Sequence, residues 1–266
     1  MVGYPPPVPH PIWPLVDVRV RTLLLRLRRP TDDDCVALAQ LAAAGVHDPA
    51  CMPFDIPWTD AAPGELEQGA LRWRWRQRAE WQPERWTFTG AVFVDDQPVG
   101  VPDLVGEDVS RLRVVHTGSW LGRRFQGRGI GREMRAAILQ LAFAGLGAAH
   151  ADSSASTDNP ASLAVSRALG SVDKGETVKL RRGVAARNRT LRLDRAGWLR
   201  SRRDDIAIDP LGPCLAWFGL SGAAAGGEPA PVPAVRTAVA PGRIRPARSR
   251  RRRGWSAAAS GLPVAG

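Results

Sequence analysis

The sequence predicts one mixed α/β domain in which helices flank a mostly antiparallel sheet. Its 266 residues are enough to bury a sizeable core, and 44% hydrophobic with 24% charged residues is typical of a soluble globular protein. Segments with the period-two pattern of strands alternate with segments of helical spacing. A change of composition near residue 221 marks the end of the domain. We therefore expect an N-terminal arm at 1–20, the domain at 21–220 and a tail at 221–266.

The first two elements are predicted by the residues at their boundaries. The run TLLLRL at 22–27 has the composition of a strand. Thr31 is a helix N-cap, and the three acids that follow it suit the positive end of the helix dipole. Gly45 is the residue type that ends helices, so the first helix is expected to run to residue 44.

The remaining elements follow the order helix, three strands, helix, strand, helix and two closing strands. They are a loop with an aromatic edge at 46–63, a helix at 64–82, strands at 86–94, 99–105 and 109–121, a helix at 127–145, a strand at 148–154, a helix at 159–169, and strands at 174–182 and 187–194. With the first strand and helix, this order is that of a mixed α/β domain.

The tail has a composition that cannot form a packed core. Ala, Gly and Pro make up 25 of its 46 residues, so we expect it to be disordered. Its eight arginines and one glutamate contribute +7 to the net charge of +11, which leaves +4 for residues 1–220. The domain is only mildly basic, and its charge does not by itself indicate a nucleic-acid-binding protein.

The cysteines and histidines argue against several classes of protein. Cys35, Cys51 and Cys214 are widely spaced and form no CxxC pair, which argues against a disulfide framework or a thiolate zinc site and suits a reducing cytoplasm. The four histidines lack HExxH-like spacing, so we expect no metal. The sequence has neither a signal-peptide pattern nor a run of about 18 apolar residues, so we expect a cytoplasmic protein that does not enter a membrane.

The most informative motif is a glycine-rich turn that follows the strand expected at 109–121 and opens a helix. It reads Gln126-Gly127-Arg128-Gly129-Ile130-Gly131. Glycines allow successive backbone N–H groups to converge, and a helix N-terminus adds its dipole, so such a turn suits a phosphate group. The alternative is a strand-to-helix turn that binds nothing.

Two other phosphate-binding motifs do not fit this turn. A dinucleotide-binding GxGxxG motif would need glycine where the chain has Arg132 or Met134. A Walker A loop would need a lysine, and this segment has none.

Two motifs resemble those of the GNAT family of N-acetyltransferases. The glycine-rich turn resembles the family's acyl-CoA pyrophosphate loop, and NPASLAVSRALG at 159–170 resembles its second signature, at the usual distance. The segment GSWL at 118–121 is similar to the ribosomal-protein-alanine acetyltransferase branch. Residues 20–220 also resemble actinobacterial proteins of this family, down to the ending RDDIAIDPLGPCLAWFGL.

The resemblance implies a splayed sheet whose strands at 109–121 and 148–154 part to admit acetyl-CoA. The pantetheine arm would lie along the end of the first strand, and the pyrophosphate on the amides of the glycine-rich turn. The cofactor-binding residues expected on this basis are Ser119, Trp120, Leu121, Arg124, Gln126, Gly127, Arg128, Gly129, Ile130, Gly131, Asn159 and Ser162.

The resemblance also implies direct attack of the amine on the thioester, without an acyl-enzyme. The thiols are then expected to be buried and inert. Many family members have a tyrosine where this chain has Ser166, so Ser166 is a candidate acid, with a cofactor hydrogen bond or a helix-packing role as the alternative. His116 stands where the related branch often carries Glu and is the candidate base; a solvated strand histidine is the alternative.

The amine acceptor is expected to bind near the segment 31–82, since the family builds acceptor pockets from this variable region. Phe54 and Trp58 in the aromatic loop are expected to face the acceptor. Trp73, Trp75 and Trp81 have helical spacing, and we expect them to pack rather than to line a site.

The leading hypothesis is an N-acetyltransferase that moves the acetyl group of acetyl-CoA to a primary amine of a small molecule or of a protein N-terminus. A non-catalytic acyl-CoA sensor is an alternative, because the family's tyrosine is missing. A nucleic-acid-binding protein that uses the arginines of the tail is another, but the tail lacks interleaved aromatic residues apart from Trp255, so we do not expect it. The chain is expected to be a monomer or a homodimer.

Overall fold

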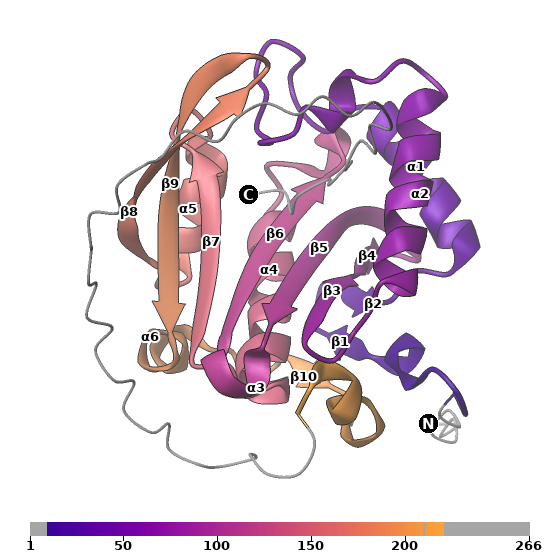
Figure 1. The fold of residues 1–266 in the computed structure, drawn as a ribbon, viewed down its shortest axis with the longest axis vertical. Coiled ribbons are helices and arrows are strands. Elements are labelled where there is room, and N and C mark those ends of the chain that lie inside the picture. The colour runs from indigo at the N-terminus through magenta and orange to yellow at the C-terminus, as the bar shows by residue number, and fades with distance from the viewer. Residues whose placement is uncertain (1–9, 210, 221–266) are drawn as a thin grey trace, which may run out of the picture.

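The structure is a computed structural model that describes residues 10–209 and 211–220 (Figure 1). Its strands are β1 (Arg19–Arg21), β2 (Arg26–Arg28), β3 (Arg85–Thr89), β4 (Ala91–Val94), β5 (Gln97–Glu107), β6 (Val114–Leu121), β7 (His150–Ser156), β8 (Val172–Arg181), β9 (Val184–Asp194) and β10 (Ala207–Ile208). Its α-helices are α1 (Asp32–Ala43), α2 (Glu65–Ala79), α3 (Val109–Leu112), α4 (Ile130–Gln140), α5 (Pro160–Ala168) and α6 (Arg195–Ser201).

The strands form one sheet in the order β10-β1-β2-β4-β5-β6-β7-β9-β8, and β3 pairs with the second half of β5. The β6–β7 pair is parallel, while the other strand pairs in the described part of the chain are antiparallel. The predicted mixed fold with a mostly antiparallel sheet is therefore confirmed.

Helices cover both faces of the sheet, with α1 and α2 on one face and α4 and α5 on the other (Figure 1). Neighbouring residues at the end of β6 point to opposite faces, as side chains alternate along a strand. Trp120 packs in the cluster that contains Leu38 of α1, and Leu121 packs in the cluster that contains Met134 of α4. Strand β6 thus separates two hydrophobic layers.

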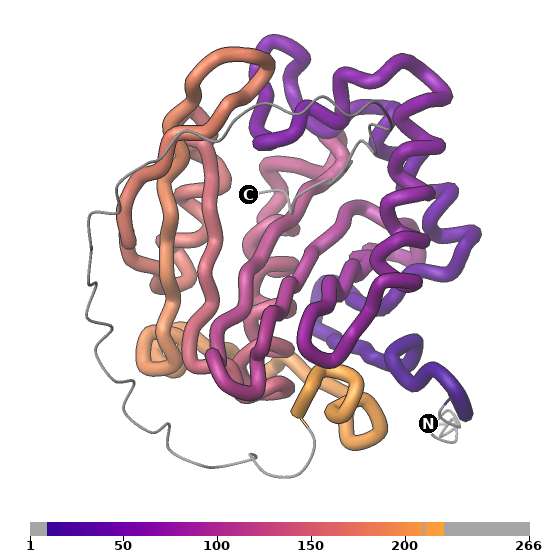
Figure 2. The backbone as a smooth tube through the Cα atoms, in the orientation of Figure 1, coloured from indigo at the N-terminus to yellow at the C-terminus, as the bar shows by residue number. Residues whose placement is uncertain are grey.

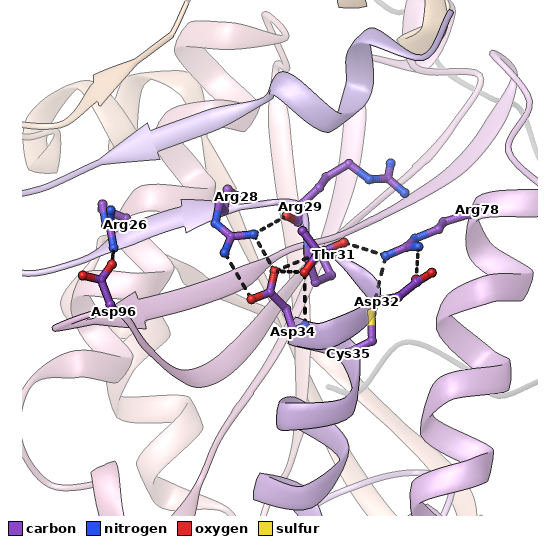
Figure 3. A network of polar contacts seen from close by, with 10 residues as sticks. Arg26, Arg28, Arg29, Thr31, Asp32, Asp34, Cys35, Arg78 and Asp96 are labelled. Carbon is purple, nitrogen blue, oxygen red and sulfur yellow. Dashed lines mark hydrogen bonds and ion pairs between the residues drawn. The ribbon is translucent and has the colours of Figure 1, made fainter. Parts of the chain in front are cut away.

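A polar network fixes the first two helices to each other (Figure 3). Thr31 and Asp34 form a capping box: the Thr31 hydroxyl accepts from the Asp34 N–H at 3.2 Å, and the Asp34 carboxylate accepts from the Thr31 N–H at 2.7 Å. Arg78 of α2 donates to the Asp32 carboxylate at 2.6 Å. The start of α1 therefore sets the position of α2, including the residues one turn before Arg78.

The part of the expected N-terminal arm that the structure describes differs from a loose segment. Residues 14–17 form a 3₁₀-helix, and β1 pairs with both β2 and β10. Leu15 and Val20 are fully buried, so this segment contributes to the core, although residues 10–12 are exposed. Residues 1–9 and the tail at 221–266 lie outside the described residues.

Three predicted strands have different boundaries in the structure. Residues 22–25 of the strand expected at 22–27 form a turn, in which the Thr22 N–H donates to the Leu25 carbonyl at 3.0 Å, and β2 begins only at Arg26. The strand expected at 86–94 is divided at Gly90, because Pro102 on β5 has no N–H for the ladder and its carbonyl accepts from the Gly90 N–H at 2.9 Å. The strand expected at 109–121 begins with the short helix α3, and β6 follows it. The elements α6 and β10 were not predicted.

Candidate active site

Strands β6 and β7 form a fork, as the splayed sheet requires. They pair from Val114 with His150 to Thr117 with Ser153, and both strands then continue without pairing to each other (Figure 2). The Gly122 N–H donates to the Val99 carbonyl on β5. Since backbone groups alternate between the two edges of a strand, those of Ser119 and Leu121 face the opening of the fork.

The glycine-rich turn joins the free end of β6 to α4. Gly127 and Gly129 have φ of +73° and +80°, and an added Cβ would meet nothing within 4 Å at either position. Their need for glycine is therefore conformational rather than steric. Gly131 has no such φ, and its Cβ would make an ordinary 3.5 Å contact with Leu121.

The start of α4 supplies backbone donors beside this turn. Gly129 is the N-cap, and its carbonyl accepts from the Glu133 N–H at 3.1 Å. The amides of Ile130, Gly131 and Arg132 come before Glu133, whose N–H is the first to donate within the helix, so they are available to a ligand. An anion at this position would also gain from the helix dipole.

The side chains expected in the turn have different environments. Gln126 donates from Nε2 to the Val46 carbonyl at 2.6 Å and to the Leu121 carbonyl at 2.9 Å. Arg124 lies over the Phe125 ring at 4.8 Å, and Arg128 is exposed. The Gln126 side chain therefore holds the turn in place, whereas Arg124 and Arg128 are both exposed to solvent.

A buried arginine that the sequence did not reveal lies beneath the fork, on the side of α4. Arg135 donates to the Thr117 hydroxyl at 2.9 Å and to the Ser119 hydroxyl at 3.1 Å. Burial lowers the pKa of this guanidinium to about 10. Its place on the apolar face of α4, next to Met134 and one turn before Leu139, is the signal that could have identified it.

Ser166 lies at the same level of the fork. It is buried on α5, and its hydroxyl is 3.4 Å from that of Ser153, the last β7 residue paired with β6. The structure thus brings Ser166 to the fork, beside the hydroxyls that Arg135 holds.

Asn159 and Ser162 stand at the start of α5. The Asn159 side chain accepts from the Ser162 N–H at 3.2 Å, so it acts as the helix N-cap. The side-chain carbonyl of Asn159 is therefore used as a helix cap. Both residues lie after the end of β7 rather than at the glycine-rich turn.

His116 is exposed and lies on the face of the sheet that α1 and α2 cover. Its neighbour across the parallel pair is Asp152. That carboxylate is engaged by Arg192 at 2.6 Å and Lys174 at 2.8 Å, and these hydrogen bonds lower its pKa although burial acts to raise it. Asp152 is thus committed to β8 and β9.

A cavity of about 240 Å³ lies on the same face, between α2 and the sheet. Its residues are Trp58, Ala61, Glu65, Leu66, Gly69, Ala70, Trp73, Arg74, Asp103 and Trp120. Trp58 is one of its lining residues, whereas Phe54 is buried against His47 and Trp58. Trp73, expected to pack, is a lining residue. The side chain of Trp120 lines the cavity too, and its backbone groups face β5, so Trp120 is not placed to bind a donor in the fork.

The thiols lie apart from the glycine-rich turn in sequence. Cys35 and Cys214 are buried, and burial raises the pKa of both, that of Cys214 to about 11. Cys51 is exposed, which differs from the expectation of three buried thiols.

Residues 10–209 and 211–220 contain no group of three or more His, Cys, Asp or Glu side chains that could hold a metal ion. No helix in this part of the chain is long and apolar enough to cross a membrane.

Comparisons with known proteins agree with this geometry. A family model described as an acetyltransferase (GNAT) domain matches residues 25–172, more than half of the chain. Among solved structures, Mycobacterium smegmatis RimJ with a CoA disulfide has a TM-score of 0.58 at 18% identity. The match covers 67% of this chain and 86% of the RimJ chain.

Two further structures have similar scores. RimL, a ribosomal α-N-protein acetyltransferase solved with coenzyme A, has a TM-score of 0.53 at 18% identity, over 65% of this chain and 95% of its own. A Salmonella typhimurium acetyltransferase that modifies the N-terminal serine of a ribosomal protein has 0.52 at 20% identity, over 65% and 96%. At these identities the likeness concerns the fold.

Proposed function

Because this chain belongs to the GNAT acetyltransferase family, we propose that it transfers the acetyl group of acetyl-CoA directly to a primary amine. The observation that carries the proposal is the fork between β6 and β7, whose free edge leads into the glycine-rich turn and the N-terminus of α4. A hydrogen-bonding strand edge beside a cluster of backbone amides suits acetyl-CoA, whose pantetheine arm carries two amide groups and is joined to a pyrophosphate.

The donor would be held mainly by backbone groups. Ser119 offers its N–H and carbonyl and Leu121 its N–H to the pantetheine amides, and the amides at 127–131 face the pyrophosphate. Arg124 and Arg128 extend from the same turn and add positive charge. In this proposal the thioester lies near Gly118, just past the last β6–β7 pair.

Proton transfer needs a base for the amine and a partner for the leaving thiolate. His116 is the proposed base, because the alternation along β6 gives it the same face as Gly118. Ser166 is the proposed donor to the thiolate in place of the family's tyrosine. The Arg135 guanidinium and its two hydroxyl partners add positive charge near the position where the thiolate would develop.

The acceptor is a primary amine of a small molecule or of a protein N-terminus. The names of RimL and of the Salmonella typhimurium acetyltransferase favour a protein N-terminus, whereas the cavity beside α2 favours a small molecule. The monomeric or homodimeric state and the cytoplasmic location stay predictions from the sequence.

Acetyl-CoA binding is tested by calorimetry on the full chain and on Gly129→Val. A valine at φ +80° strains the turn and brings a side chain to the pyrophosphate, so affinity should fall by about 100-fold or more. Gly183→Val is the matched control, because Gly183 has φ +76°, open space and a position in the β8–β9 turn. Unchanged affinity in Gly129→Val would show that the donor binds elsewhere.

Catalysis is tested by thiol release with acetyl-CoA and a panel of amines. Release that depends on an amine supports the transferase. Tight acetyl-CoA binding without release from any amine would instead favour a sensor. Salt-dependent DNA binding that is lost on deletion of 221–266 would favour the nucleic-acid alternative.

A further inference from the structure

The cavity beside α2 contains two buried charged residues whose polar atoms are not satisfied. Arg74 is 4% exposed and Asp103 is 3% exposed. Among the described residues, Arg74 Nε and Nη1 and Asp103 Oδ1 find no hydrogen-bond partner. Leaving such groups unpaired costs free energy, so an arrangement of this kind needs an explanation. A ligand that offers an acceptor to the arginine and a donor to the aspartate would supply one.

The walls of the cavity suit an apolar or aromatic group. The indoles of Trp58, Trp73 and Trp120 line it, and the Trp58 and Trp120 rings are 6.0 Å apart at their centroids. The space exists because α2 presents small residues here, and an added Cβ at Gly69 would meet nothing within 4 Å. The cavity therefore combines a charged floor with a shell of aromatic rings.

The charged floor adjoins the fork. Asp103 on β5 pairs with Gly118 on β6, so their Cα atoms are about 5.5 Å apart or closer and share one face of the sheet. Gly118 contributes no side chain, and it is the first residue of β6 beyond the last β6–β7 pair. An amine held by Asp103 would therefore lie beside the position proposed for the thioester.

The loop at 46–63, which contributes Trp58 to the cavity, is held to the β8–β9 hairpin by polar contacts. Asp55 pairs with Lys179 and accepts from Asn188, Asp60 pairs with Arg182 at 2.5 Å, and Arg181 donates to the Met52 carbonyl at 2.7 Å. These contacts join the loop at 46–63 to the β8–β9 hairpin, and Figure 1 shows the two side by side. Such a closed loop favours a small ligand over an extended polypeptide.

We propose that this cavity binds the acceptor, a free α-amino acid with an aromatic or large apolar side chain. Its ammonium group would pair with Asp103, its carboxylate with Arg74, and its side chain would pack among the three indoles. The two opposite charges at the floor match the two charges that an amino acid carries on one carbon atom. This inference rests on the proposed acetyl transfer, for which it names the acceptor.

The raised pKa of Asp103 agrees with this role. Burial raises the pKa of the carboxyl to about 6, although the charge of Arg74 acts to lower it. A cationic ammonium group in the cavity would stabilise the ionised form and satisfy Oδ1. Other charged or titratable groups near the cavity are Glu65 of α2, His116 of β6, and Cys35 and Arg78, whose charges act on Arg74.

The experiment compares three amines in a thiol-release assay with the full chain and acetyl-CoA. They are L-phenylalanine, phenethylamine, which lacks the carboxylate, and a tripeptide with N-terminal phenylalanine, which offers Arg74 only an amide carbonyl. We expect kcat/KM for L-phenylalanine to exceed that of the other two by about tenfold or more. An equal or better rate with phenethylamine or the tripeptide, or no turnover of L-phenylalanine, would overturn the inference.

Variants link the preference to the cavity. Arg74→Met should abolish the preference for L-phenylalanine over phenethylamine, and Gly69→Leu should block L-phenylalanine by filling the open space. Both should bind acetyl-CoA as the parent does, which also reports that they fold. Arg72→Met, on the exposed side of the same helix, is the control. Wild-type behaviour of both Arg74→Met and Gly69→Leu would contradict the inference.

Failure of the inference and failure of the proposed function give different results. If acetyl-CoA does not bind the parent chain, the proposed function itself is wrong. If acetyl-CoA binds and the tripeptide is acetylated while L-phenylalanine is not, the transferase stands and this cavity is not its acceptor pocket.

Discussion

The two faces of β6 each bury an arginine, but they use it differently. On the α4 side, Arg135 bonds two of its nitrogens to hydroxyls and leaves only Nε without a partner among the described residues, and the neighbouring donor groups are backbone amides. On the α2 side, Arg74 and Asp103 leave polar atoms unsatisfied in an open cavity. A binding surface made of backbone depends on fold and glycine positions, whereas one made of side chains depends on the particular residues of this chain. We infer that the first face serves the common donor and the second selects the acceptor.

Removing the base should have the largest effect and would separate the roles of two residues on the acceptor face. His116→Ala is expected to lower kcat/KM by about 10²–10⁴ and to remove the acidic limb of the pH profile, while acetyl-CoA affinity is retained. Asp103→Asn is expected to raise KM for the amine and to leave that limb in place. The measurement is kcat/KM against pH for both variants. The reverse pattern would make Asp103 the base and His116 a solvated strand residue.

The covalent course of the reaction has its own test. Direct transfer predicts that no thiol becomes acetylated when the chain is incubated with acetyl-CoA alone. Cys51 is the exposed thiol to monitor by mass spectrometry. An acetylated cysteine together with ping-pong kinetics would contradict direct transfer.

The unsatisfied charges of the acceptor face should reduce stability above pH 6. The folded chain holds the Asp103 proton up to about pH 6, whereas the unfolded chain loses it near pH 3.8. The folded state therefore binds more protons in this window, and stability falls as pH rises through it. Asp103→Asn lacks this loss. Its free energy of unfolding relative to that of the parent should therefore rise by up to about 3 kcal/mol between pH 4 and pH 7.5. Urea unfolding at both pH values measures it, and an identical change with pH in parent and variant would refute it.

The arginine of the donor face should matter for the rate more than for binding. Arg135→Met removes a buried charge, so the melting temperature should stay equal or rise. Its kcat should fall by about tenfold, because the fork loses positive charge where the thiolate develops, while the Kd for acetyl-CoA changes little. Arg132→Met, on the exposed side of α4, controls for a general loss of charge. An unchanged kcat in Arg135→Met would give Arg135 a purely structural role.

The smallest effect is expected from removing the tail. Truncation after Leu220 deletes no apolar run that could pack, so melting temperature and acetyl-CoA affinity should hardly change. Scanning calorimetry measures the first and isothermal titration the second. A drop of many degrees would mean that residues 221–266 dock on the domain, and that one of the two faces is incomplete without them.

The donor face could be predicted well from the sequence, because glycines and caps act locally. The turn at 126–131 and the Asn159 cap lie where their residue types require particular backbone conformations. The residues of the fork were predicted from the resemblance to the GNAT family rather than from the periodicity of the sequence. Ser166 was identified in this way, but its neighbour Arg135 was missed, because its burial depends on how α4 packs under β6.

The acceptor face could not be predicted in the same way. Helix α2 has arginine at every second position from 72 to 78, with Trp73, Trp75 and Gln77 between them, a pattern that gives no sign of which arginine is buried. The choice of Arg74 follows from the docking of α2 on α1, which Arg78 fixes through Asp32. Asp103 offered a clearer signal, since it is a lone acid within the predicted strand at 99–105.

The hydrogen bonds of Gln126 couple the two faces of the molecule. This side chain, part of the donor turn, holds the carbonyl of Val46 at the start of the loop that lines the acceptor cavity. Acetyl-CoA bound at the turn would also restrict the loop. An acceptor that binds afterwards would then lose less conformational entropy in ordering it. We therefore expect positive cooperativity, with acetyl-CoA tightening amine binding by the same factor as the amine tightens acetyl-CoA binding. Gln126→Ala should reduce that factor towards one in paired titrations, leaving the two substrates to bind independently.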